Sequence, residues 1–432
     1  MQQACCLRGV GKSYVGSVLI LGAAAVIVGC SSAGQVGPQT KPYLLPIPNA
    51  SELAHPRPLE QRGLPAEATR AAVPPNNLQS VDKVALGQKL FFDGRLSADG
   101  TVACSSCHDP ARAFTDGRRV SIGIKGRVGQ RNAPTILNAL YNTTQFWDGR
   151  ARTLEEQAAF PIVNPSEMGQ PNLEAAVARV AGIREYRKAF ERVFGGPPNS
   201  SNLLRAIASY ERTEVSFDSP FDHFIAGEKN AIEPAAKRGW ALFNGRGRCT
   251  TCHSVTRGQP DVTTFTDHGF HDIGVVMIRA DTVTMARQAE QLVTPADMGA
   301  VDRTAIQSNL SLLGRFLVTR QDADIGAFKT PGLRNLLMTA PYFHDGSHAT
   351  LWDVLDHYNK GGDLNDPLLD TDMRPLALKE ADIDDLAAFL ASLTSPDYRQ
   401  PALKELARQR KLARTTRPYR DTARAFGPKP IV

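Results

Sequence analysis

Apolar residues recur every three or four positions in several parts of the chain, which is the spacing of an amphipathic helix. The pattern is clear in residues 81–92, 201–215 and 380–393. No convincing run alternates apolar and polar residues as a half-buried strand would. The sequence therefore predicts an all-α body. The positions that define the three helical faces are Val84, Gly87 and Phe91; Leu203, Leu204, Ile207 and Tyr210; and Ile383, Leu386, Leu390 and Leu393.

The N-terminus has a different pattern, in which Arg8 and Lys12 precede an apolar run at 15–29. This run is too short for a comfortable membrane span. Its last residues, "IVGC", resemble a lipobox, so residues 1–29 are interpreted as a lipoprotein-type signal peptide that is cleaved before Cys30. The Cys30 thiol would then carry lipid. A plain secretory signal or an uncleaved anchor are the alternatives, and each of the three places the body outside the cytoplasm.

Composition and charge divide the rest of the chain. Residues 30–80 are rich in Pro, Ala and Ser and are expected to form a tether. The body, about 81–398, has the length of two domains. Residues 399–432 form a basic tail of net charge +8, which leaves about −4 on 30–398 within a total of +6. We expect this tail to be a solvated extension or to contact anionic lipid or an acidic partner. A nucleic-acid ligand is not expected, because no aromatic residues interleave with a basic stripe.

Two short stretches carry the chemistry: "VACSSCHDP" at 102–110 and "RCTTCHSV" at 248–255. In each, two cysteines can form thioethers with the vinyl groups of a haem, and the histidine that follows can reach the iron. A zinc site built from the two cysteine pairs is the alternative, but it leaves both histidines unexplained. We therefore predict two covalent c-type haems, held by Cys104, Cys107 and His108 and by Cys249, Cys252 and His253. Since the other three of the seven cysteines are Cys5, Cys6 and Cys30, no disulfide scaffold is expected.

The chain also contains an internal repeat. Residues 133–157 align without a gap to 330–354 at an offset of 197, with eight of 25 positions identical. The stretch "GQKLFFDGR" ahead of the first pentad likewise resembles "GWALFNGRG" ahead of the second. Because the pentads are offset by only 145 residues, the second half carries 52 extra residues. The sequence predicts two domains from one ancestor, with an insertion around 276–312 to which no role is assigned.

These motifs together resemble the bacterial di-haem cytochrome c peroxidases and the related MauG enzymes, over about residues 83–395. The resemblance rests on "LGQKLFFDGRLS", both pentads, "RNAPTILNALYN", "FWDGR", "EEQ", "SEMG", "GAFKTPGLRN" and "TAPYFHDGSH". It implies two class I cytochrome c-like haem domains in tandem, a peroxidatic one at 81–230 and an electron-transfer one at 231–398. It also implies calcium near their interface, bound by the side chain of Asn132 and the carbonyl groups of Thr339 and Pro341.

The same resemblance predicts that the two haems differ. In the family the distal ligand of the second haem lies 14 residues after the histidine of "APYFH", which makes it Tyr358 here. MauG-like members have tyrosine at this position, whereas the peroxidase members have methionine. The repeat equates Tyr358 with Pro161, which offers no side-chain ligand. A loop histidine that blocks the first haem in many relatives is replaced by Ile124. Methionine ligation of the second haem stays open through Met277, Met285, Met338 and Met373.

The resemblance assigns catalytic roles to three residues of the first half. Glu167 would move protons between the oxygens of peroxide, although by itself it could be a surface carboxylate. Gln157 would orient peroxide or only support the site, and Trp147 would carry electrons between the haems or serve only as buried structure. His344 is expected near the second haem. The remaining histidines are expected to be structural or at the surface: His55, His223, His268, His271, His348 and His357.

Three functions follow from this reasoning. The first is a periplasmic di-haem peroxidase, lipid-anchored to a bacterial membrane, that reduces hydrogen peroxide to water with electrons from a small cytochrome c or cupredoxin. The second is a MauG-like oxidase that modifies protein side chains through a high-valent haem, for which Tyr358 is the specific indication. The third is a di-haem electron carrier, which an open first haem disfavours. Whether the protein forms a homodimer stays open.

Overall fold

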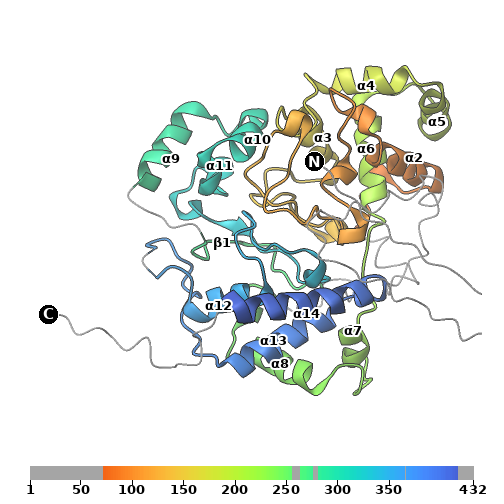
Figure 1. The fold of residues 1–432 in the computed structure, drawn as a ribbon. Coiled ribbons are helices and arrows are strands. Elements are labelled where there is room, and N and C mark those ends of the chain that lie inside the picture. The colour runs from red at the N-terminus through yellow and green to blue at the C-terminus, as the bar shows by residue number, and fades with distance from the viewer. Residues whose placement is uncertain (1–71, 255–262, 276–280, 365, 417–432) are drawn as a thin grey trace, which may run out of the picture. The chain divides into compact units, whose positions relative to one another are not determined.

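The computed structural model describes residues 72–254, 263–275, 281–364 and 366–416, all of which belong to one compact unit, Leu44–Val432. The structure is mainly helical, as predicted (Figure 1). The predicted leader and Cys30 lie outside the described residues. Within the described residues, no helix is long and apolar enough to cross a membrane.

The helices form three groups, of which the insertion interrupts the second half. The first half contains α2 (Val81–Phe91), α3 (Leu154–Val163), α4 (Leu173–Ala181), α5 (Arg184–Phe194) and α6 (Ser200–Glu211). The insertion contains α9 (Asp281–Leu292) and α10 (Met298–Gln307), with α11 (Phe316–Thr319) after it. The second half contains α7 (Pro220–Ile225), α8 (Pro234–Asn244), α12 (Leu351–Lys360), α13 (Glu380–Ser392) and α14 (Arg399–Thr416). Two short strands, β1 (Phe270–His271) and β2 (Phe328–Lys329), pair antiparallel.

The three helices predicted from periodicity are confirmed as α2, α6 and α13. Their predicted apolar faces are buried, with only Leu204 partly exposed. Ser80 begins α2 by accepting a hydrogen bond from the Lys83 backbone N–H, which satisfies one of the free donors at a helix start.

Each half is built on a pair of helices that cross at a glycine. A Cβ atom at Gly87 of α2 would lie 1.8 Å from the carbonyl oxygen of Ala206 in α6. A Cβ atom at Gly239 of α8 would lie 2.0 Å from the carbonyl oxygen of Asp385 in α13. Only glycine permits backbones to approach this closely. The two glycines are the first residues of the repeated stretches "GQKLFFDGR" and "GWALFNGRG". Both copies of the repeat therefore keep the glycine that the close helix crossing requires.

Each half also has its own apolar core. The first core runs from Val84 to Tyr210 and the second from Phe221 to Ala413. The insertion and α11 form a third cluster, from Ala286 to Ile325. Phe221 of α7 packs against Trp240 and Phe389 of the second core, although α7 precedes the predicted boundary at residue 230.

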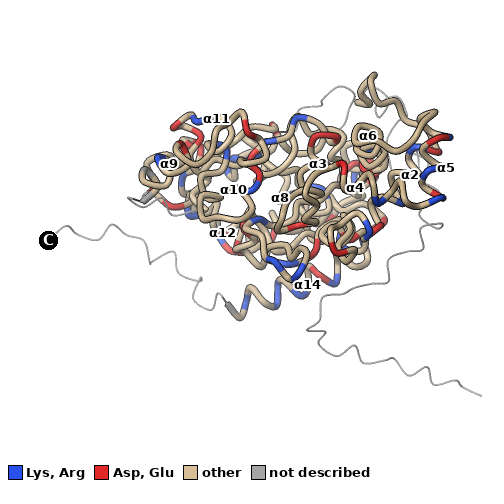
Figure 2. Tube along the Cα trace, turned by 90° about the horizontal axis from the view of Figure 1, so that it is seen from above, with Lys and Arg blue, Asp and Glu red and all other residues tan. Residues whose placement is uncertain are grey.

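The folded body is longer than predicted at both ends. Asn77, assigned to the tether, is buried and donates hydrogen bonds to Glu155 (2.6 Å) and to the carbonyl of Arg205 (3.0 Å). The start of the predicted basic tail is the helix α14, whose charged residues Figure 2 shows along the surface of the body. Gln409 of α14 is fully buried and accepts a hydrogen bond from the Leu351 backbone N–H (2.9 Å). Residues 417–432 lie outside the described residues.

We expect the substitutions Gly87→Ala and Gly239→Ala each to destabilise the protein, because the added methyl group would force the crossing helices apart. Overpacking of this kind costs about 1–3 kcal/mol or more. The measurement is urea unfolding of the haem-loaded protein. Gly196→Ala is the matched control, since a Cβ atom there meets nothing within 4 Å; equal stability of all three variants would show that the crossings are not tight.

Candidate active site

A cavity runs through the body and is lined by both pentads. The site residues predicted from the sequence come from distant parts of the chain, yet all of them line this cavity. They are Cys104, Cys107, His108, Asn132, Trp147, Gln157, Glu167, Cys249, Cys252, His253, Thr339, Pro341 and Tyr358. The structure thus brings the whole predicted set together.

The histidines of the two pentads are held in the same way. The Nδ1 atom of His108 lies 3.0 Å from the carbonyl oxygen of Phe114, and that of His253 lies 2.9 Å from the carbonyl oxygen of Phe265. Both phenylalanines have left-handed backbone conformations, with φ of 60° and 59°. Burial lowers the pKa of both imidazoles, with the two carbonyl groups opposing it. A neutral ring oriented through one nitrogen leaves the other, Nε2, available to a metal.

The cysteines fit thioether attachment to haem better than zinc binding. Burial raises the pKa of the Cys107 and Cys249 thiols to about 12. Among the described residues, the one cluster of potential metal ligands is Cys252, Asp267 and His271. It contains a single cysteine, so the two pairs do not converge on one zinc ion.

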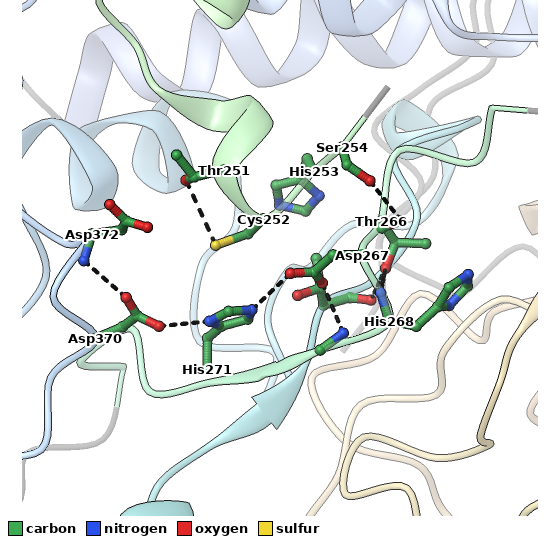
Figure 3. A network of polar contacts seen from close by, with 12 residues as sticks. Thr251, Cys252, His253, Ser254, Thr266, Asp267, His268, His271, Asp370 and Asp372 are labelled. Carbon is green, nitrogen blue, oxygen red and sulfur yellow. Dashed lines mark hydrogen bonds and ion pairs between the residues drawn. The ribbon is translucent and has the colours of Figure 1, made fainter. Parts of the chain in front are cut away.

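That cluster is part of a network of polar contacts beside the second pentad, which Figure 3 shows from close by. His271 is held between Asp370, 2.6 Å from Nδ1, and Asp267, 2.9 Å from Nε2. A hydrogen bond to Cys252 and these carboxylates raise the pKa of His271 to about 10. Since the Cys252 sulfur would be a thioether in the haem-loaded protein, only the carboxylate contribution would persist there. The His271 imidazole is therefore held beside the pentad by two carboxylates.

The helices that face the two pentads are equivalent in position. α3 begins at Leu154 and α12 at Leu351, which are aligned in the repeat. Pro161 and Tyr358 thus occupy the same position in two equivalent helices, and both line the cavity. In the first half Ile124 is buried in the apolar core. No side chain at either predicted position could ligate iron in the first half.

The methionine candidates are separated by the structure. Met373 lines the cavity together with Tyr358. Met285 packs against the cluster of the insertion, and Met338 packs against the two main cores. Met277 lies outside the described residues. Among the described candidates, Met373 is therefore the methionine that remains as an alternative ligand.

Glu167 lies in a tight loop after α3. Its backbone N–H donates to the carbonyl of Asn164 (3.0 Å), and its own carbonyl accepts from the Ile124 N–H (2.8 Å). Gly123 packs so closely that a Cβ atom there would lie 2.6 Å from the Glu167 Cα. The backbone that carries this carboxyl group is therefore fixed from both sides.

The Glu167 carboxyl group is in an unusual electrostatic environment. Its Oε2 atom is buried and has no hydrogen-bond partner among the described residues. Burial and the nearby negative charge of Asp302 raise its pKa to about 8, with Arg150 opposing them. A carboxyl group with a pKa near neutrality can both accept and donate a proton. Gln157 precedes Pro161 by one helical turn, on the same face of α3.

Arg131 was not predicted, and its surroundings fit a bound haem. Its side chain is buried, and its Nε and Nη1 atoms have no hydrogen-bond partner among the described residues. Burial lowers the pKa of this guanidinium to about 10, although the group stays charged at neutral pH. Because Arg131 lines the cavity, its free donors fit the propionate groups that a haem would bring.

Trp147 and Asn132 lie where the halves meet. The Trp147 indole N–H donates to the Asn132 carbonyl (2.9 Å), and the Trp147 carbonyl accepts from the Lys329 N–H (2.7 Å). The Asn132 N–H donates to the carbonyl of His344 (2.8 Å). His344 is buried, stacked on Phe328 at 3.5 Å between ring centroids. The tryptophan is thus anchored to both halves.

Three functional candidates had no separate sequence signal. Arg131 belongs to the motif "RNAPTILNALYN" and Arg150 to "FWDGR", but the sequence assigned a role only to other residues of these motifs. Asp302 lies in the insertion, to which no role was assigned. Arg150 and Asp302 form a buried ion pair, with 2.9 Å between Nε and Oδ1. Only the folded chain brings these residues, 152 positions apart, into contact.

Comparison with known proteins agrees with this geometry. Residues 81–230 match the family model described as di-haem cytochrome c peroxidase. The chain is 38% identical over 322 residues to the methylamine utilization protein MauG of Methylorubrum extorquens, which covers 74% of this chain and 80% of that protein. It is 35% identical over 342 residues to the cytochrome c551 peroxidase of Nitrosomonas europaea, covering 78% and 87%.

A solved structure supports the same assignment. The crystal structure of a MauG-like protein associated with microbial copper homeostasis matches with a TM-score of 0.61 and 35% sequence identity, over 75% of this chain and 92% of that one. The fold, the two haem c attachment sites and the relatives identify an oxidoreductase that acts on peroxide. The chain therefore belongs to the family of di-haem cytochrome c peroxidases and MauG proteins.

Proposed function

We propose that this protein reduces hydrogen peroxide to water in the first half of the chain, with electrons that a small periplasmic cytochrome c or cupredoxin delivers to the second half. The observation that carries the proposal is the difference between two equivalent helices. Pro161 of α3 has no side-chain group that could bind iron, whereas Tyr358 occupies the equivalent position of α12, and both line the cavity. One half is thus suited to bind peroxide and the other to relay electrons.

Each haem, when bound, supplies an iron that gains and loses electrons beside these protein groups. The overall reaction consumes one hydrogen peroxide, two electrons and two protons and releases two water molecules. Glu167 accepts a proton from one peroxide oxygen and returns it to the other, so that the O–O bond breaks with water as the leaving group. Its raised pKa, about 8, suits both steps. Gln157 orients peroxide by hydrogen bonding.

Trp147 is the proposed route for electrons between the halves. Its hydrogen bonds to the backbone of Asn132 and Lys329 hold the indole in one position. A fixed aromatic ring between two redox centres shortens the gap that an electron crosses. The same residue therefore serves both as buried structure and as the bridge.

A second function, MauG-like oxidation of a protein side chain, is favoured by Tyr358 and by the similarity to a MauG protein. An anionic oxygen ligand would favour oxidised states of the second haem. Oxidised Trp or Tyr in a partner protein, detected by mass spectrometry after peroxide addition, would select this function. A pure electron carrier is disfavoured because it has no use for the Glu167 carboxyl group beside an open site.

The proposal includes three further features that rest on the family resemblance and the leader. Calcium would bind the side chain of Asn132 and the carbonyl groups of Thr339 and Pro341; the Asn132 amide is already oriented by a bond from Nδ2 to the Arg118 carbonyl (2.8 Å). A lipid on Cys30 would anchor the protein to a bacterial membrane, facing the periplasm. A homodimer is the third feature.

We expect Glu167→Gln to leave both haems attached and reducible while lowering peroxide turnover about 10²-fold or more, because the proton relay is lost. Turnover is measured as peroxide-dependent oxidation of a reduced cytochrome c. Glu185→Gln, on an exposed face of α5, is the matched control. Turnover of the Glu167 variant within a few-fold of wild type would remove this residue from the mechanism.

His253→Gly should abolish turnover driven by the electron donor, because the relay haem loses its proximal ligand. Added imidazole should restore part of the rate by filling the space of the missing side chain. His223→Gly, at an exposed histidine, serves as the control. Normal donor oxidation by the His253 variant without imidazole would mean that electrons enter the first half directly.

The fully ferric protein should react with peroxide without prior reduction, since neither Ile124 nor Pro161 can close the first haem. Stopped-flow spectra of the Soret band test this, and electron paramagnetic resonance should show one high-spin and one low-spin haem. Tyr358→Phe should alter the low-spin signal, whereas Met373→Leu should not. Two low-spin signals at rest, with a lag relieved only by reduction, would contradict the prediction.

A further inference from the structure

The insertion contacts the active site of the first half, and a buried acidic residue is part of this contact. Asp302 of α10 is 2% exposed. Its Oδ1 atom accepts a hydrogen bond from Nε of Arg150 (2.9 Å), and its Oδ2 atom accepts one from Nδ2 of Asn164 (2.6 Å). Both partners belong to the first half. The carboxylate is therefore shared between a buried cation and a buried amide.

Asn164 connects this contact to the loop that carries Glu167. The carbonyl of Asn164 accepts from the backbone N–H groups of Glu167 (3.0 Å) and Gly169 (2.9 Å). Its Oδ1 atom accepts from the Ser166 N–H (2.9 Å) and from Nε2 of Gln307 in α10 (3.1 Å). The polar atoms of Asn164 thus shape the loop on one side and bind α10 on the other. A shift of α10 would move the loop.

The same contact sets the charges near the Glu167 carboxyl group. The Arg150 guanidinium binds Asp148 (2.9 and 3.1 Å) as well as Asp302. This buried group already holds two carboxylates and one cation, so an ionised Glu167 would add a third negative charge. Removal of one partner of such a group leaves an uncompensated buried charge.

The other arginines nearby do not take the place of Arg150 in pairing these buried carboxylates. Arg315 donates to the backbone carbonyls of Asp148 and Gly149 (2.9 and 3.0 Å), and Arg127 donates to that of Pro165 (2.8 Å). Arg131 also lies near Arg150 and Asp148 and donates to the carbonyl of Ser311 in the insertion. The thiols of Cys104 and Cys107, which also face Glu167, carry no charge once they are thioethers.

We propose that Asp302 is a positioning residue for the peroxidase reaction: through Asn164 it holds the Glu167 loop against the cavity, and with Arg150 it sets the charge that the Glu167 carboxyl group faces. The inference rests on the proposed role of Glu167. It gives the insertion a function, since α10 supplies a part of the active site that the duplicated halves do not contain.

The test uses the haem-loaded protein and two readouts. The first is the pH dependence of the reaction with peroxide. The second is the infrared C=O stretching band of the protonated Glu167 carboxyl group in the resting protein, assigned as the band that is absent from Glu167→Gln. In wild type the band should disappear with a midpoint well above the ordinary pKa of a glutamate. A wild-type midpoint at the ordinary value of about 4.3 would overturn the proposal without any further variant.

Asp302→Asn removes the negative charge, which lowers the pKa of Glu167. The midpoints of both readouts should therefore shift to lower pH by about one unit or more. Gln307→Leu breaks the contact to Asn164 without a change of charge, so it should lower the rate but leave the midpoints in place. Glu290→Gln, an exposed position of the same insertion, should change neither.

The outcomes separate this inference from the function on which it rests. If Glu167→Gln keeps its turnover, the proposed role of Glu167 fails. If Glu167→Gln is inactive but Asp302→Asn keeps the wild-type midpoints with both haems attached, the role of Asp302 fails. If Asp302→Asn does not fold, the wild-type infrared midpoint and the peroxide rate of Gln307→Leu still test the proposal. An unchanged rate in Gln307→Leu would contradict the positioning of the Glu167 loop by α10.

Discussion

The crossing of two helices at a glycine is the constraint on which each half depends. α2 meets α6 at Gly87, and α8 meets α13 at Gly239, in each case with the glycine Cα against a backbone carbonyl. Because the pentad begins 13 residues after the end of α2 and five residues after the end of α8, this crossing helps to place the cysteines and the histidine at the cavity. A side chain at either position would displace the helix that leads into the site.

The duplicated halves hold the histidine of the pentad in the same way, and they differ at the helix on the opposite, distal side of the haem site. Phe114 and Phe265 use the same left-handed conformation to direct a carbonyl toward the proximal histidine. Holding that histidine is a requirement of any haem, so both copies retain it. At the equivalent step of α3 and α12, in contrast, one copy has proline and the other tyrosine. The chemical difference between the halves is therefore concentrated where peroxide or a ligand would approach the iron.

Much of this could be predicted from the sequence, because the relevant signals were local or repeated. Periodicity predicted α2, α6 and α13, and the repeat equated Pro161 with Tyr358. The assignment of α14 to a solvated tail was wrong for residues 399–416 because charge obscured a buried stripe: Ala402, Leu406, Gln409 and Ala413 recur at helical spacing. Arg131 and Asp302 could not be identified, since their importance arises from contacts between distant segments.

Two buried arginines illustrate how the protein and its cofactors complete one structure. Arg150 has carboxylate partners on the chain itself, Asp148 and Asp302, so its charge is balanced by folding alone. Arg131 has donors without partners among the described residues and faces the same cavity. A buried cation of this kind is costly unless it is paired. Haem propionates would supply the missing charge, in which case attachment of haem would stabilise the first half beyond its apolar contacts. Arg150 would then be paired by folding, with Asp302 of the insertion as one partner, and Arg131 by the cofactor.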